Sequence, residues 1–225
     1  MKLLSTSSKI DKSQNDQWLN YVVYLEPSVD YKTLCKGASE GCKASCLTNS
    51  GMMRMPTQTS ARIERTRFYL DDKQGFIDQL RKEIDSALRK AIKAGKRLAI
   101  RLNGTSDIDW RDIYLAYPQV QFYEYTKRAN IAKANSDISN LHLTLSRNER
   151  TSPSKILAVT QTGTNVAVVF DDRKAMPSEY LGLKVINGDK HDRRFEDGHG
   201  VIIGLKLKGT NAIKQTARET GFAVC

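Results

Sequence analysis

The sequence of 225 residues predicts an α/β fold, specifically a small or partial β/α barrel of about six to seven mostly parallel strands with outer helices. Two observations predict it. Segments rich in β-branched and aromatic residues alternate with helical segments at the spacing of βαβ units, which implies parallel strands covered by helices. Polar residues follow nearly every strand-like segment. This favours the barrel over a doubly wound sheet, although the order of the segments alone fits both.

The first predicted strand covers residues 21–25, and the cysteine-rich loop follows it directly. A helical pattern, with apolar residues on one face, then extends over residues 60–94, and Gly95 is suited to end it. The remaining predicted strands cover residues 98–102, 120–125, 141–145, 165–170, 183–186 and 201–205. Further helices are expected over residues 109–117 and 126–135, and between Ser152-Pro153 and Gly163.

The composition is that of a folded protein with one main domain. Because 40% of the residues are apolar, the chain can build a core, which argues against intrinsic disorder. Residues 1–16 are polar and are expected to form a flexible N-terminal segment. Residues 17–225 are expected to form a single α/β domain.

The charge balance is strongly basic. The chain has 36 Lys and Arg against 25 Asp and Glu, a formal net charge of +11, which favours an anionic partner such as nucleic acid or a phosphorylated small molecule. No segment reaches the roughly 20 apolar residues of a membrane span, and the first residues lack the apolar core of a secretory signal. We therefore expect no membrane partner and a reducing cytoplasm, where cysteines remain thiols.

Three of the four cysteines, Cys35, Cys42 and Cys46, lie within twelve residues. The residues between them are mainly Gly, Ser, Lys and Glu, so the thiols are not simple core filler. Gly37 and Gly41 would let the backbone approach the sulfurs and point N–H groups at them. A spacing of six and then three residues in one loop fits a [4Fe-4S] cluster better than the paired hooks of structural zinc. Zinc and redox thiols without a metal are the alternatives.

Cys225 ends the sequence. It is either a fourth cluster ligand or an exposed spare thiol at a loose terminus. If Cys225 is not a ligand, one iron keeps an open site for solvent or a small molecule.

Polar side chains at the predicted strand ends are candidate site residues, because ligands of β/α folds bind at the carboxyl ends of the strands. The candidates for catalysis are Lys127, which could hold an anionic ligand, and Asp189 and His191, which could move protons. The candidates for cofactor binding are Asn103, Thr105, Asp107, Tyr125 and Ser146. We expect all of them on the rim that carries the cysteine loop, where the loop and at least four of these side chains line one pocket, although for any single segment a solvated loop is the favoured interpretation.

Four motifs occur in order along the chain: the cysteines with Gly41 and Gly51 at 35–51, RLNGTSD at 101–107, YEYTK at 123–127 and GDKHDR at 188–193. Together they resemble the bacteriophage gene product 88 family over about residues 27–208. The resemblance implies a phage origin and the cytoplasm of an infected bacterium.

A more distant similarity is to radical S-adenosylmethionine enzymes. They too place three cysteines after the first strand of a partial β/α barrel and bind a cluster with one open iron. The cysteine spacing here is longer than theirs, and no counterpart of their glycine-rich S-adenosylmethionine loop is found. Cluster and fold can therefore be shared without the radical chemistry.

The sequence thus predicts an iron–sulfur phage protein whose [4Fe-4S] cluster is held by Cys35, Cys42 and Cys46 at the open rim, in a redox, radical or reductive role. S-adenosylmethionine is a candidate cosubstrate, and whether the protein is an enzyme stays open. The alternative is a basic nucleic-acid-binding protein with a structural zinc or iron–sulfur site. The expected partners are an anionic small molecule at the rim and nucleic acid bound without sequence specificity.

Overall fold

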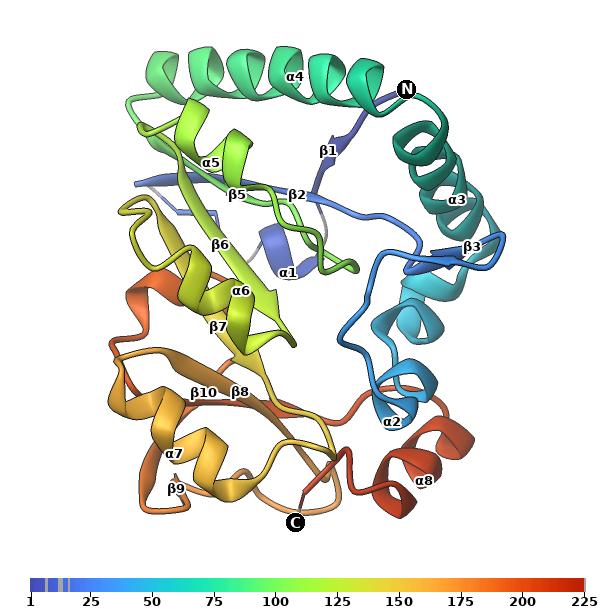
Figure 1. The fold of residues 1–225 in the computed structure, drawn as a ribbon, viewed down its shortest axis with the longest axis vertical. Coiled ribbons are helices and arrows are strands. Elements are labelled where there is room, and N and C mark those ends of the chain that lie inside the picture. Colours follow the sequence, from blue (N-terminus) through green and yellow to red (C-terminus); the bar gives the residue numbers. More distant parts are fainter. Residues whose placement is uncertain (7, 12–13, 16, 225) are drawn as a thin grey trace. The chain divides into compact units, whose positions relative to one another are not determined.

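The computed structural model describes residues 1–6, 8–11, 14–15 and 17–224 and shows a mixed α/β structure (Figure 1). In these residues nine strands form one sheet, most of whose strand pairs are parallel. In sheet order the strands are β1 (Leu4–Ser5), β2 (Trp18–Val23), β5 (Arg97–Arg101), β6 (Gln121–Thr126), β7 (Leu141–Ser146), β8 (Asn165–Phe170), β11 (Ile202–Lys206), β10 (Leu183–Asn187) and β9 (Glu179–Tyr180). The predicted α/β class with parallel strands is therefore confirmed.

The chain divides into two compact units that interleave in sequence. Unit 1 consists of Met1–Lys36, Pro56–Glu124 and Asn135–His142. Unit 2 consists of Gly37–Met55, Tyr125–Ala134 and Leu143–Cys225. Each unit has a hydrophobic core of its own.

Unit 1 is built on the parallel pairs β2–β5 and β5–β6, with β1 antiparallel to β2. A separate two-stranded sheet is formed by β3 (Ser28–Val29) and β4 (Lys32–Thr33). The helices of the unit are α1 (Ser8–Asp11), α3 (Pro56–Asp71), α4 (Lys73–Lys93) and α5 (Arg111–Ala116). Because its apolar residues recur every three or four positions, α4 buries one face in the core through Phe76, Leu80, Ile84, Ala87 and Ala91.

The helical pattern predicted over residues 60–94 corresponds to two helices, α3 and α4. The interruption lies at Asp72, whose carboxylate accepts a hydrogen bond from the N–H of Gly75 at 2.9 Å. A capping side chain of this kind starts a new helix, because it satisfies an N–H group that has no partner within the helix.

Unit 2 is built on the parallel pairs β7–β8, β8–β11 and β11–β10, with β9 antiparallel to β10. Its helices are α2 (Glu40–Ala44), α6 (Ala129–Ala134), α7 (Pro153–Gln161) and α8 (Asn211–Glu219), with the short turns η1 (Leu47–Asn49), η2 (Gly51–Arg54) and η3 (Arg194–Glu196). The start of α7 is as predicted: Ser152 caps the helix by accepting a hydrogen bond from Lys155 N–H, and Pro153 opens its first turn. None of the helices in the described ranges combines the length and the apolar character needed to span a bilayer.

Candidate functional site

The cysteine loop lies in unit 2 from Gly37 onward and contains the short helix α2. Ser39 caps α2, because its hydroxyl accepts a hydrogen bond from the N–H of Cys42. Cys35, Cys42 and Cys46 are all free thiols and half-buried. This cap fixes the backbone at Cys42 within the first turn of α2.

Glu149, which follows β7, holds the start of α2 through two hydrogen bonds. Its carboxylate accepts the hydroxyl of Ser39 at 2.6 Å and the N–H of Gly41 at 2.9 Å. Partial burial acts to raise the pKa of Glu149, but these two hydrogen bonds, together with the backbone of Glu149 and the charge of Arg150, outweigh it and the pKa lies below its ordinary value. The N–H of Gly41 is therefore engaged by a carboxylate, and the expectation that it points at a sulfur is wrong.

Two glycines let the cysteine loop lie directly against the rest of unit 2. A Cβ atom on Gly37 would be 2.8 Å from the Cβ of Lys127, just after β6. A Cβ on Gly41 would be 2.7 Å from Oγ1 of Thr220 and 2.9 Å from Oε2 of Glu149. The cysteine loop therefore contacts residues that follow β6 and β7, at the carboxyl ends of strands, which is where α/β folds bind their ligands.

Lys127, one of the three catalytic candidates, lies beside the cysteine loop, because its Cβ is close to Gly37. Asp189 follows β10 and accepts hydrogen bonds from the N–H of Lys206 at 2.9 Å and from Nζ of Lys208 at 2.8 Å. His191 is half-buried in the same segment as Asp189. Burial and the positive charge of Arg194 hold the pKa of His191 below its ordinary value, so the imidazole is neutral at pH 7.

Three of the cofactor-binding candidates, Asn103, Thr105 and Asp107, lie in unit 1 and are buried after β5. The side-chain oxygen of Asn103 accepts hydrogen bonds from the N–H of Ile108 and from the indole of Trp110. Thr105 donates its hydroxyl to the carbonyl of Leu25. Asn103 and Thr105 therefore stabilise the loop after β5.

The other two cofactor-binding candidates lie in unit 2. Tyr125 is 8% exposed and belongs to a core cluster with Ala167 and Ile203. Ser146 pairs with Ala167 in the parallel ladder between β7 and β8.

Of the remaining predicted cluster ligands, Cys35 belongs to unit 1, and Cys225 lies outside the described residues. Across the described ranges, no three or more His, Cys, Asp and Glu side chains gather closely enough to hold a metal ion.

Glu124, in β6 of unit 1, is a buried titratable residue that was not among the candidates. Its carboxylate accepts the N–H of Leu102 at 2.6 Å and that of Asn103 at 2.9 Å. Burial raises the pKa of Glu124 to about 8, against the lowering effect of Arg101 and of the two N–H groups. The signal in the sequence is a Glu between Tyr123 and Tyr125 in a strand whose other positions are almost all buried.

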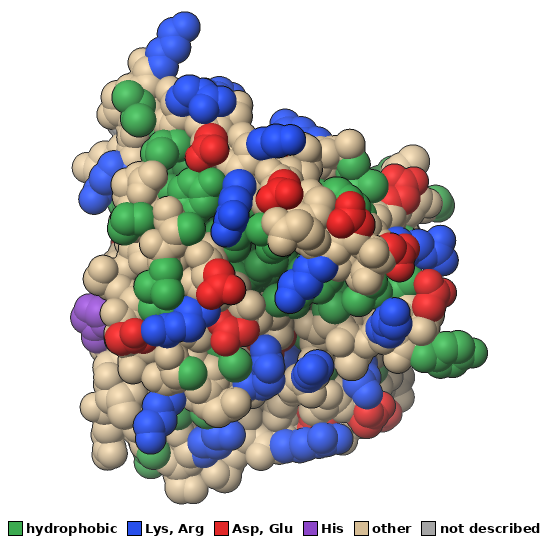
Figure 2. Space-filling model, turned by 45° about the horizontal axis from the view of Figure 1, so that its top comes forward, with side chains coloured by type: hydrophobic (Ala, Val, Ile, Leu, Met, Phe, Trp, Pro, Cys, Tyr) green, Lys and Arg blue, Asp and Glu red, His purple; other side chains and the backbone are tan. Residues whose placement is uncertain are grey.

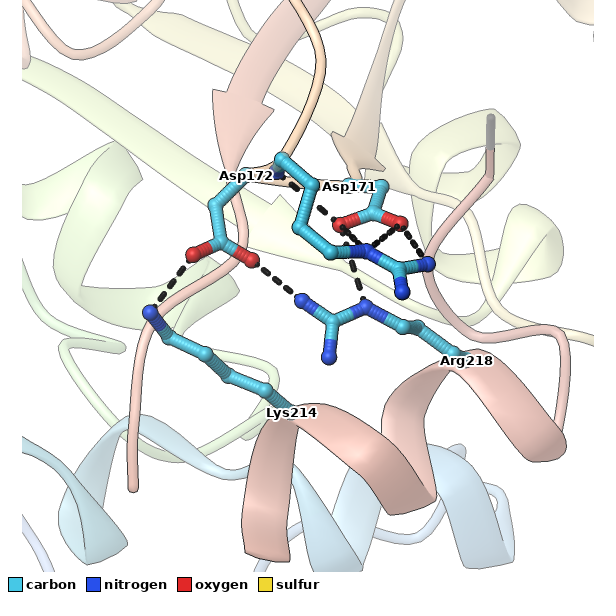
Figure 3. A network of polar contacts seen from close by, with 5 residues as sticks. Asp171, Asp172, Lys214 and Arg218 are labelled. Atoms are coloured by element: carbon cyan, nitrogen blue, oxygen red, sulfur yellow. Dashed lines mark hydrogen bonds and ion pairs between the residues drawn. The ribbon is translucent and has the colours of Figure 1, made fainter. Parts of the chain in front are cut away.

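An ion-pair network joins α8 to the end of β8 (Figure 3). The sequence did not predict this network. Asp171 is buried and contacts Arg173 at 2.6 Å and Arg218 at 3.0 Å. Asp172 contacts Arg218 and Lys214, each at 2.6 Å. Hydrogen bonds from Arg173 and Arg218 hold the pKa of Asp171 well below its usual range, although desolvation opposes them.

A cavity of about 590 Å³ opens in unit 2 between the segment after the cysteines and the loop that joins β11 to α8. Its lining includes Ser50, Arg54, Lys208, Gly209, Thr210 and Lys214. Three of these side chains are cationic, and no Asp or Glu belongs to the lining. None of the site residues predicted above lines this cavity, so the pocket shared by four of them is not found here.

The comparisons with known proteins give one result. The sequence matches the family described as gene product 88 over residues 1–224. No curated protein and no solved structure matches the chain.

Proposed function

The chain belongs to the bacteriophage gene product 88 family, and we propose that it is an iron–sulfur protein that binds a [4Fe-4S] cluster through Cys35, Cys42 and Cys46. Its place of action in this proposal is the cytoplasm of the infected bacterium. The reducing conditions there keep thiols available as ligands.

The donor set supports the proposal. Three thiols lie within twelve residues of sequence, and none of them is in a disulfide. Thiolates are soft ligands that select iron–sulfur clusters, zinc or copper(I) over hard cations. Cluster binding requires the three sulfurs to converge, so we expect residues 35–46 to rearrange when the cluster is loaded.

The anchoring of the cysteine loop is the observation that carries the proposal. The loop is anchored by a carboxylate and by two glycines, on which a Cβ atom would lie 2.8 Å and 2.7 Å from its nearest neighbour. Glu149 clamps Ser39 and Gly41, and Gly37 packs on Lys127. These contacts hold the start of the loop at the carboxyl ends of β6 and β7, where ligand sites of α/β proteins lie.

The chemistry of such a site follows from its neighbours. A bound cluster supplies electron transfer or an open iron for a small molecule. Lys127, beside the loop, supplies a positive charge that favours an anionic ligand. We propose a redox, radical or reductive role in a sheet that curls into a partial barrel, with S-adenosylmethionine as the candidate cosubstrate.

Replacement of single cysteines tests the ligand set. We expect Cys35→Ser, Cys42→Ser and Cys46→Ser each to lose the visible absorption and the iron of anaerobically reconstituted protein. Cys225→Ser is the matched control: retention of the full spectrum would assign an open iron, and loss would assign a fourth ligand. Retention of full iron and sulfide in the triple variant of Cys35, Cys42 and Cys46 would overturn the proposal.

The second candidate function is binding of nucleic acid around a structural zinc or iron–sulfur site, and the net charge of +11 favours it. Figure 2 shows Lys and Arg side chains spread over the face that is drawn, with Asp and Glu side chains among them. Such a surface would bind nucleic acid through phosphate contacts without sequence specificity. We expect the affinity for any duplex to fall steeply with salt. Tight binding to one defined sequence that resists salt would instead favour a dedicated binding protein.

A further inference from the structure

The cavity in unit 2 between η2 and the β11–α8 loop has only positively charged side chains among the ionisable residues of its lining. It is lined by Arg54, Lys208 and Lys214, and no carboxylate belongs to its lining. We propose that this cavity binds the phosphate group of a phosphorylated ligand. The proposal does not depend on the cluster, because it concerns other side chains and holds for the cluster-free protein.

The two lysines of the cavity are each paired with one carboxylate, whereas Arg54 is exposed. Lys208 and Lys214 each contact one carboxylate outside the lining, that of Asp189 at 2.8 Å and that of Asp172 at 2.6 Å. Each ammonium group has three donors, so a single carboxylate fixes its position and leaves donors for a ligand. Arg54 is exposed and makes no ion pair within the described ranges, which leaves a whole guanidinium fork for a phosphate.

The backbone at the start of α8 also favours an anion in this cavity. Lys208, Gly209 and Thr210 connect β11 directly to α8, a nine-residue helix whose N-cap is Thr210. Helix N-termini that follow a parallel strand favour anions, because their free N–H groups and the helix dipole point at the ligand. Gly209 has φ of +123°, and a Cβ there would be 2.7 Å from Cγ2 of Ile213. The glycine therefore allows the close turn that places the helix start at the cavity.

The size of the cavity sets the class of ligand. Its volume of about 590 Å³ lies within the range of small-molecule and cofactor sites, roughly 300–1,000 Å³. A nucleotide monophosphate fits such a volume, and so does one phosphate with its neighbours in a single strand of nucleic acid. Both ligands present a phosphate group, and the experiment below distinguishes the nucleotide from the nucleic-acid strand.

Binding by the full-length, cluster-free protein is measured for three probes: inorganic pyrophosphate, AMP and a single-stranded DNA of mixed sequence. We expect Arg54→Ala to weaken the binding of the preferred probe roughly tenfold, as befits the loss of a charge-assisted contact. Arg89→Ala is the matched control, because Arg89 is an exposed arginine of α4 in unit 1 and its removal changes the net charge equally. Its affinity is expected to equal that of the wild type.

The pattern across the probes identifies the source of the phosphate. Binding of AMP or pyrophosphate that depends on Arg54 assigns a small phosphorylated ligand. Binding of the oligonucleotide alone, again with a larger loss in Arg54→Ala than in Arg89→Ala, assigns a nucleic-acid strand. The proposal is overturned if no probe binds with a Kd below about 1 mM, or if the two variants weaken binding equally.

Discussion

Glu149 is the residue on which the placement of the cysteine loop depends. It joins Ser39 and Gly41 to the end of β7 across more than a hundred residues of sequence. Both contacts are donated to the carboxylate, so a side chain with an NH₂ group at this position must lose one of them. The effect of losing this hydrogen bond on the stability of the cysteine loop can be measured in the absence of any ligand.

We predict that Glu149→Gln destabilises the loop by about 1 kcal/mol, because one hydrogen bond is lost and an amide faces a donor. Hydrogen exchange at the amide of Gly41 should then be roughly fivefold faster. Glu179→Gln, an exposed glutamate in β9, is the control and should leave that exchange unchanged. Equal exchange rates in the two variants would show that Glu149 does not hold the loop.

Glu124 makes the stability of the protein depend on pH. Its pKa is raised to about 8 in the folded state from an ordinary value of 4.5. The folded state therefore holds the proton more tightly than the unfolded state. This contribution to stability is complete below pH 4.5 and is lost as the pH rises through 8.

We predict that Glu124→Gln removes this dependence. Between about pH 5 and 8 the free energy of unfolding of the wild type should fall relative to that of the variant by about 1.4 kcal/mol per pH unit. Urea unfolding of both proteins at several pH values measures the difference. A difference that stays constant over this range would mean that Glu124 titrates normally in the folded protein.

At the scale of elements, α8 is fastened to the end of β8 by charge. Arg218 bridges Asp171 and Asp172, and Lys214 adds a second contact to Asp172 (Figure 3). Because α8 also packs against α2 and carries Thr210 and Lys214 at the cavity, this network positions the proposed phosphate site. Buried Asp171 would lose one of its two partners if Arg218 were removed.

We predict that Arg218→Ala increases amide hydrogen exchange in α8 by at least about tenfold, because Asp171, which is buried, and Asp172 each lose one of their two cationic partners. The thermal unfolding temperature should fall by several degrees. Arg89→Ala should change neither quantity. Protection of α8 that is as strong in Arg218→Ala as in the wild type would assign its anchoring to apolar packing through Ala217 and Phe222 instead.

Much of the fold of the whole molecule could be predicted from the sequence. The strands β5 and β8 follow from short runs of apolar residues, and β7 follows from the alternation of Leu with polar residues. The helix α7 follows from the Ser-Pro start and the Gly end. α8 was not predicted, since Ile213 and Ala217 are too few apolar residues to reveal its buried side. α2 was not predicted because it is one turn long and is held by its cap and by Glu149.

The residue types of the candidate site could be predicted from the sequence, whereas the contacts that position the cysteine loop could not. The three thiols and Lys127 are visible as residue types near strand ends. The contacts that place the loop join Gly37 to Lys127 and Gly41 to Glu149, pairs about a hundred residues apart, and tertiary packing alone brings such pairs together. The cationic cavity likewise combines Arg54 with Lys208, which have no common signal in the sequence.

The metal content of protein purified under anaerobic conditions tests the central proposal most directly. Iron, acid-labile sulfide and zinc are measured per chain on the same sample, together with its visible spectrum. A [4Fe-4S] cluster held by the cysteine loop predicts about four iron and four sulfide per chain, a broad absorption near 400 nm and no zinc. One zinc per chain, or neither metal after reconstitution with iron and sulfide, would contradict it.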